Sequence, residues 1–270
     1  MNSFQDNYVN EYFELMEVVE SWKNKYNVIS NLNISTMTFV CDTGIPIDLL
    51  ELTNNFRTPS YPLCILKKAK SNKDVSYTKR GKPRKSFYNQ TTISYKINNT
   101  VSAKIFTNGK LQLTGLTSLY NCIESINLIC SILKNSNAIS HIPSISSILS
   151  ISIEMINSNF NIQKEIDLKK LRNILFYNNF KVSYEPDTYP GINSKINDIS
   201  VFIFGTGNIV ITGSKSIKTI ENTFKTICSF IFNNPDVFIK NGPGLKKNKR
   251  QAYYINGYPK HIYENCMFYS

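Results

Sequence analysis

The chain has 270 residues, enough for one large domain or two medium domains with a substantial hydrophobic core. Its 31 lysines and arginines exceed its 19 aspartates and glutamates, and the formal net charge of +12 favours a polyanionic partner such as nucleic acid or an anionic membrane surface. The six cysteines form no CxxC pair and only two histidines accompany them, so we expect reduced, buried thiols and no metal site. The start, MNSFQDNYVNEYF, lacks the features of a signal peptide, and the most apolar segment, Ile139–Ile156, is interrupted by serines and Pro143 and does not suit a membrane helix, so we expect a soluble protein.

The first third of the chain alternates strand and helix patterns. An N-terminal helix is expected over Glu11–Lys23, a strand over Ser35–Cys41, and an amphipathic helix over Ile45–Phe56. From Lys67 to Lys85 the sequence KKAKSNKDVSYTKRGKPRK carries nine lysines and arginines against the lone Asp74. Such a segment favours a solvated loop that is disordered without a ligand and orders on binding.

Two strands, a third strand and a helix are predicted next. The stretch Ile93–Phe106 alternates apolar and polar residues around the turn formers Asn98 and Asn99, and the pair Asn108-Gly109 makes a second tight turn. After the strand LQLT, the glycine Gly115 closes the meander, and Ser118–Leu133 has helical spacing with a serine as N-cap.

The same order of elements then occurs a second time. The stretch Ile203–Gly213, IFGTGNIVITG, repeats the pattern IFTNGKLQLTG of Ile105–Gly115 at an offset of 98 positions. This copy is predicted to contain a strand over Ile153–Ile162, a helix over Ile166–Phe180, hairpin strands over Ile192–Phe204 and a helix over Ser216–Ile231. Each copy has two helices to cover one face of its strands, so the sequence predicts an α+β fold with the other face open.

The second copy carries a recognisable motif. It reads YEPDTYPGINSKI over Tyr184–Ile196 and VFIFGTGNIVITGSK over Val201–Lys215. This resembles the second repeat of the TATA-box-binding protein (TBP) family, whose pattern is YEPxxFPG, then IFxSGKxVhTGAK, then a helix. The first copy, SFYNQTTISYKI followed by KIFTNGKLQLTG, is a more divergent version. The composition, rich in Asn, Ile, Lys, Ser and Tyr, together with the additional terminal segments, looks like the TBP-like proteins of large cytoplasmic DNA viruses.

The resemblance implies a fold and a mode of binding. In this family two repeats form one curved antiparallel saddle sheet with helices on its convex face, and the concave face grips the minor groove of DNA. Aromatic rings there wedge between base steps and bend the duplex. Pyrimidine–purine steps unstack at low cost, which gives a TATA preference without base-specific hydrogen bonds.

The motif also implies DNA-binding residues in the second repeat. Phe204 and Tyr189 fall on the two wedge positions, and Phe202, Val210 and Thr212 fall on neighbouring groove-facing positions. Ordinary core packing is the alternative reading of the two phenylalanines, and the family pattern favours the groove. Asn157 is a loose candidate for the asparagine of the family's first strand.

The first repeat departs from the family pattern. Phe106 matches a wedge and Thr114 the groove threonine, but Lys104 and Gln112 stand where the family has apolar residues, so we expect polar DNA contacts there. For the second wedge Gln90 is nearest by alignment, and Phe87 or Tyr88 would serve in a shifted register. For the first-strand asparagine Leu32 aligns, with Asn33 one place away.

Basic and acidic loops complete the predicted interface. The expanded basic loop, about 67–87, is the family's stirrup, and we expect phosphate contacts from Lys79, Arg80, Lys82, Arg84 and Lys85. In the second stirrup Glu185 and Asp187 stand where the family presents acidic residues to transcription factor IIB, although Thr188 replaces a usual leucine. A solvated turn is the alternative.

The predicted function is a TBP-like general initiation factor without catalysis or cofactor. Its expected partners are AT-rich promoter double-stranded DNA, a transcription factor IIB-like protein and RNA polymerase, with no membrane and no small-molecule substrate. If viral, it would act in the host cytoplasm or virion, and if cellular, in the nucleus. One alternative keeps the fold for RNA or a protein partner, and another makes it an accessory domain of a nuclease or glycosylase. No P-loop and no Ser-His-Asp set supports an enzyme.

The predicted organisation has four parts. A helical extension (1–29) precedes the first repeat (30–137), which contains the basic loop. The second repeat (138–234) is followed by a basic and aromatic tail (235–270). Lysines and an arginine at 246–250 in this tail could contact nucleic acid or a partner.

Overall fold

The computed structural model describes residues 2–27, 29–57, 59, 62–67, 89–96, 99–143, 150–239, 254–255 and 258–259. The chain forms two compact units, which we call unit 1 (Met1–Thr36 with Glu154–Ser270) and unit 2 (Met37–Ile153). The boundaries of these units differ from the predicted repeat boundaries. The strands Asn33–Asp42 and Ser150–Asn161 each begin in one unit and end in the other. The boundaries predicted from the repeat therefore stay a prediction.

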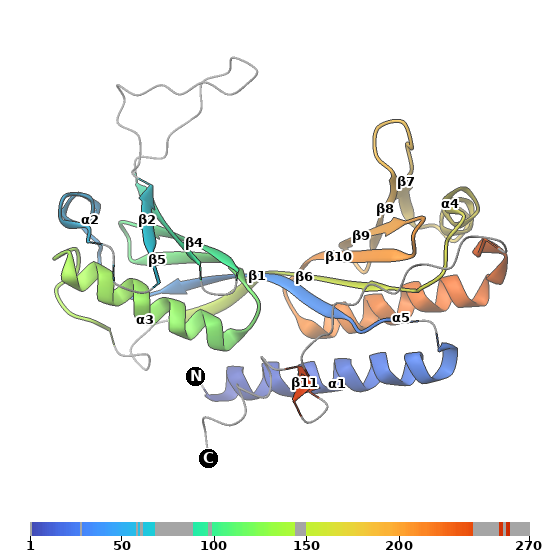
Figure 1. Cartoon of the computed structure of the whole chain (residues 1–270), viewed down its shortest axis with the longest axis horizontal. Coiled ribbons are helices and arrows are strands. Elements are labelled where there is room, and N and C mark those ends of the chain that lie inside the picture. The colour runs from blue at the N-terminus through green and yellow to red at the C-terminus, as the bar shows by residue number, and fades with distance from the viewer. Residues whose placement is uncertain are drawn as a thin grey trace. The chain divides into compact units, whose positions relative to one another are not determined.

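In its described residues, unit 2 is a meander of antiparallel strands with two helices. Its strands neighbour one another in the order β2 (Cys64–Lys67), β3 (Gln90–Lys96), β4 (Thr100–Phe106), β5 (Lys110–Leu116) and the larger part of β1 (Asn33–Asp42). Its helices are α2 (Leu49–Asn55) and α3 (Leu119–Asn135), and α3 lies along one side of the strands (Figure 1). The side chains of Ala103, Ile105 and Leu113 on that side are fully buried.

Unit 1 repeats this plan with an added helix. Its strands neighbour one another in the order β6 (Ser150–Asn161), β10 (Asn208–Ser214), β9 (Ile199–Phe204), β8 (Gly191–Ile196) and β7 (Lys181–Ser183). The other elements are α1 (Asn2–Tyr26), α4 (Leu168–Tyr177), α5 (Ile217–Asn233), the 3₁₀ helix η2 (Pro235–Val237), and the short strands β11 (Tyr254–Ile255) and β12 (Tyr258–Pro259). The expected α+β class with two similar repeats is confirmed.

The strand register repeats at the offset seen in the sequence. Ile105 pairs with Leu111 in unit 2, and Ile203 pairs with Ile209 in unit 1. The turn glycine of unit 2, Gly109, has φ +86°, and a Cβ there would lie 2.6 Å from the carbonyl oxygen of Ile45. A side chain at this turn is therefore excluded by both the backbone angle and the close approach of the neighbouring loop.

Side-chain caps fix where the helices begin. Ser118 accepts a hydrogen bond from the Asn121 amide at 3.2 Å, and Ser216 accepts one from the Thr219 amide at 3.1 Å, as predicted for N-cap serines. The predicted helix over 45–56 is shorter than expected. It begins only at Leu49, because the Asp48 carboxylate caps the amides of Leu50 and Glu51.

The N-terminal helix α1 extends beyond its predicted bounds and packs along α5 (Figure 1). Tyr12, Leu15 and Val19 are buried, and each such side chain contributes roughly 1.5–3 kcal/mol when fully buried. Farther along the helix, the rings of Tyr26 and Phe232 stack with centroids 3.9 Å apart.

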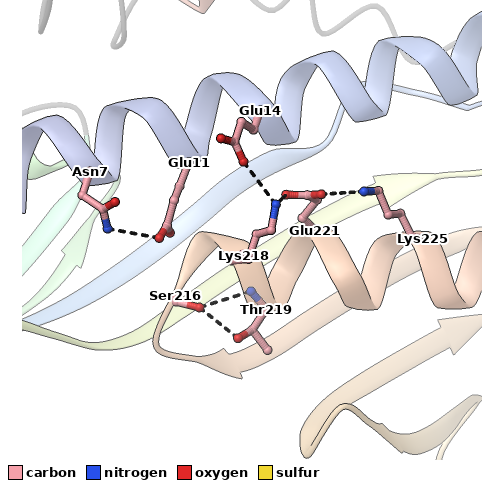
Figure 2. A network of polar contacts seen from close by, with 8 residues as sticks. All are labelled: Asn7, Glu11, Glu14, Ser216, Lys218, Thr219, Glu221 and Lys225. Carbon is pink, nitrogen blue, oxygen red and sulfur yellow. Dashed lines mark hydrogen bonds and ion pairs between the residues drawn. The ribbon is translucent and has the colours of Figure 1, made fainter.

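A carboxylate lies at the polar side of this helix pair. The Glu221 side chain is only 2% exposed, and it is held by Lys225 at 2.6 Å and Lys218 at 3.0 Å (Figure 2). Lys218 also reaches Glu14 of α1 at 3.1 Å. Because both lysines are about half exposed, the ion pairs themselves add little, and their role is to compensate the buried charge of Glu221.

Candidate nucleic-acid interface

Each unit has an open strand face opposite its helices. In unit 1 the alternation of β9 buries Val201 and Ile203 against the helix side and leaves Phe202 and Phe204 half-buried on the other side. The two phenylalanines are therefore not ordinary core residues. Phe202 and Phe204 lie on the face that the sequence predicted for DNA.

Three aromatic rings form a cluster on the open face of unit 1. The ring centroid of Tyr189 lies 5.9 Å from that of Phe202 and 5.9 Å from that of Phe204, and Tyr189 is 40% exposed. Gly191 makes room for this arrangement, because a Cβ there would lie 3.0 Å from two ring carbons of Phe204. The cluster is thus an apolar surface whose rings support one another.

Cross-strand neighbours of these rings supply the other predicted residues. Val210 pairs with Phe202 on one side and with Asn159 on the other, and Thr212 pairs with Asn157. The hydroxyl of Thr212 donates to the amide oxygen of Asn157, whose amide nitrogen donates to Thr36 Oγ1 at 2.9 Å. Val210 and Thr212 therefore share one face with Phe202, as predicted.

The open face of unit 2 has a polar row in the corresponding place. Gln112 pairs with Lys104 on one side and with Val40 on the other, and Lys104 also pairs with Thr92. Thr114 pairs with Thr38 in the next row. All four predicted residues of this repeat, Lys104, Phe106, Gln112 and Thr114, are half-buried on this one face.

Phe106 is in a different setting from Phe204. It pairs with Gln90, whereas Phe204 pairs with Gly191, so Gln90 corresponds to the glycine and not to Tyr189. Among the residues that the structure describes, no ring lies in contact with Phe106. Phe87 and Tyr88, the other candidates for a second wedge, lie outside the described residues.

Cross-strand pairing identifies the residue of β1 that corresponds to Asn157 of β6. Thr38 pairs with Thr114, and Asn157 pairs with Thr212, the equivalent threonine of the other repeat, so Thr38 corresponds to Asn157. Leu32 and Asn33 are therefore not the counterparts of Asn157. The extra residue of each bulge is a glycine with positive φ, Gly115 in β5 and Gly213 in β10.

The acidic turn before β8 is exposed. The backbone carbonyl of Glu185 accepts hydrogen bonds from the amides of Thr188 at 3.0 Å and Tyr189 at 2.9 Å, which closes the turn. Glu185 and Asp187 both lie at the surface, and Glu185 lines a hollow of about 260 Å³ together with Tyr189 and Phe202. An acidic group thus borders the aromatic cluster.

The predicted phosphate-binding residues cannot be placed. Lys79, Arg80, Lys82, Arg84 and Lys85 lie outside the described residues, as do the basic positions 246–250 of the tail.

Nucleophilic and metal chemistry has little support in the described part of the chain. Burial raises the pKa of the Cys41 thiol to about 12 and that of Cys130 to about 11, so both stay protonated near neutral pH. No cluster of histidine, cysteine and acidic side chains among the described residues could hold a metal ion. Within the same residues, no helix has the length and apolar character needed to cross a bilayer.

Comparison with known proteins relates this arrangement to a family. Residues 150–233 match the family model described as "Transcription factor TFIID (or TATA-binding protein, TBP)". The "TATA-box-binding protein-like" protein of Acanthamoeba polyphaga mimivirus is 30% identical over 231 residues, which cover 72% of this chain and 63% of that protein. The TATA-box-binding protein of Pyrobaculum aerophilum is 28% identical over 130 residues, covering 47% of this chain and 60% of that protein.

The matched region thus spans less than two thirds of the length of these two relatives. Among solved structures, Methanococcus jannaschii TBP aligns with a TM-score of 0.54 at 21% identity, over 76% of this chain and 99% of that one. The structural likeness extends to both repeats of the fold.

Proposed function

We propose that the chain is a member of the TATA-box-binding protein family, which its matches support, and that it binds AT-rich duplex DNA through the minor groove during transcription initiation. The observation that carries the proposal is the cluster of Tyr189, Phe202 and Phe204 on an open strand face. Half-exposed rings supported by their neighbours suit insertion between base steps, where unstacking costs a few kcal/mol.

The surroundings of the rings suit a minor groove. Val210 and Thr212 present small apolar and hydroxyl surfaces beside the rings, and the floor of the minor groove at A·T pairs offers acceptors without a protruding amino group. The formal charge of +12 favours phosphate binding, to which the basic loop at 67–87 would contribute.

Recruitment of further proteins is a second part of the proposal. The exposed carboxylates of Glu185 and Asp187 would face a transcription factor IIB-like protein, and RNA polymerase would follow. The site of action would be the host cytoplasm or virion for a viral protein and the nucleus for a cellular one.

A binding and bending assay tests the proposal. The full chain is titrated against an AT-rich and a GC-rich duplex of equal length, and the end-to-end distance of each duplex is followed by energy transfer. We expect tighter binding to the AT-rich duplex, with its ends brought closer. Equal affinity for both duplexes without bending would contradict the proposal. In that case, tighter binding to single-stranded RNA would favour the polar face of unit 2, around Lys104 and Gln112, as an RNA surface.

A further inference from the structure

Three asparagines lie at alternate positions of β6 on the open face of unit 1, and two of them are already engaged. The amide of Asn157 is bonded to Thr212 and Thr36. The amide nitrogen of Asn161 donates to Asn208 Oδ1 at 2.5 Å and to the Thr206 carbonyl at 3.3 Å. These two side chains stabilise the strand face itself.

Asn159, between them, is different. Its side chain is half-buried and makes no hydrogen bond to any residue that the structure describes. It lies across from Val210 and lines a hollow of about 700 Å³ whose wall also includes Phe204 and Pro190. An amide with an unused donor and an unused acceptor therefore stands beside one of the proposed wedge rings.

The chemistry of an amide fits both kinds of base pair in the minor groove. An A·T pair presents only acceptors there, whereas a G·C pair adds the N2 amino donor of guanine. The amide nitrogen of Asn159 can donate to the first, and its amide oxygen can accept from the second. An apolar side chain would leave the guanine amino group buried and unpaired, which is costly.

The corresponding position of unit 2 is apolar. Asn159 pairs with Val210, and Val210 corresponds to Gln112, which pairs with Val40. Val40 is therefore the counterpart of Asn159. The two repeats differ at this position in their ability to hydrogen-bond a base edge.

We propose that Asn159 is a base-reading residue that lets the face of unit 1 accept a G·C pair at the position it contacts. The inference rests on the proposed minor-groove function and adds a specificity rule to it. DNA sites of this protein would be AT-rich with one tolerated G·C position under unit 1, and replacing Asn159 by an apolar residue would restrict that position to A·T.

Inosine separates hydrogen bonding from other effects, because an I·C pair lacks the N2 amino group and resembles A·T in the minor groove. One G·C pair, and then one I·C pair, is moved stepwise through an AT-only duplex, and affinity is measured for the full-length wild type and Asn159→Val. For the wild type we expect one position where G·C and I·C bind within about twofold of each other. For Asn159→Val, G·C should bind about tenfold more weakly than I·C there, the cost of one unpaired polar group, with other positions unchanged.

The reciprocal variant Val40→Asn is the second arm. It should create a new tolerated position under unit 2 and leave the first in place, and it keeps the test decisive if Asn159→Val does not fold. If the folded variants have the same ratio of G·C to I·C affinity as the wild type at every position, the assignment of Asn159 is overturned. The proposed AT preference is then unaffected. If the wild type shows no preference for AT-rich duplexes, the proposed function is overturned, and the inference with it.

Discussion

Phe106 of unit 2 and Phe204 of unit 1 occupy the same register position, 98 residues apart, yet their surroundings differ. Phe204 shares a cluster with Tyr189, and a glycine opposite leaves room for its ring. Phe106 lies opposite Gln90, with Lys104 and Gln112 along its strand face. One scaffold thus presents an aromatic face in unit 1 and a polar, cationic face in unit 2, and the framework of strands and helices does not decide what each face binds.

The largest effect is expected where this difference is greatest. Phe204→Ala should weaken binding to an AT-rich duplex by about 2–3 kcal/mol, since a ring that offsets unstacking is lost. Phe106→Ala should weaken it by less than about 1 kcal/mol. Equilibrium titration of both variants at one salt concentration provides the comparison. Equal losses would show that the two repeats act symmetrically despite their different faces.

The second prediction concerns charge, which the sequence concentrates in unit 2. Deletion of Lys68–Lys85 should flatten the dependence of log K on log salt by about 0.9 for each phosphate contact removed, equally for AT-rich and GC-rich duplexes. Titrations over a range of salt concentrations measure the slope. A slope identical to that of the intact chain would mean that the loop makes no phosphate contacts.

A third effect should appear only when a partner is added. Replacement of Glu185 and Asp187 by lysine should abolish assembly with a transcription factor IIB-like protein, because the turn would become basic and would repel a basic partner surface. DNA binding alone should stay equal or become slightly tighter. Pull-down with labelled duplex separates the two steps, and undiminished ternary assembly would rule out this turn as the docking site.

The smallest effect concerns stability and belongs to unit 1 alone. Burial by itself would raise the pKa of the Glu221 carboxyl, but hydrogen bonds and charges from Lys225 and Lys218 outweigh burial and lower it. Since the folded-state pKa lies below the ordinary 4.5, the carboxylate stabilises the fold above that pH, and this contribution is lost as the pH falls through the lowered value.

Glu221→Gln should therefore lower the free energy of unfolding by about 1 kcal/mol at neutral pH, with the difference shrinking as the pH falls below 4.5. Urea unfolding at neutral and at acidic pH measures it. The equivalent helix position of unit 2 is Ile123, so Ile123→Leu is a control without this pH dependence. A difference that grows on acidification would contradict the assigned direction of the pKa.

Much of the fold could be predicted from local signals. The caps Ser118 and Ser216 and the turn glycine Gly109 act through neighbouring atoms, so sequence spacing was sufficient to place them. The edge strands β2 and β7 were not predicted, because segments of four and three residues show no periodicity.

The site was predictable only where the family motif was intact. Thr38 was missed as the counterpart of Asn157, because the expanded loop of unit 2 changes the chain separation between the first strand and Thr114, so that only the strand pairing fixes the correspondence. Asn159 was also missed, since one asparagine in a chain rich in asparagine gives no signal. What distinguishes it is the absence of a hydrogen-bond partner among the described residues, which only the structure can show.

From the difference between the two faces we propose that bound DNA is kinked under unit 1 and held without a kink under unit 2. An AT-rich duplex with 2-aminopurine placed at successive adenines reports unstacking at each step by an increase in fluorescence. We predict one unstacked region, which disappears with Phe204→Ala and persists with Phe106→Ala. Two unstacked regions of equal intensity, each lost with one of the two variants, would contradict the claim.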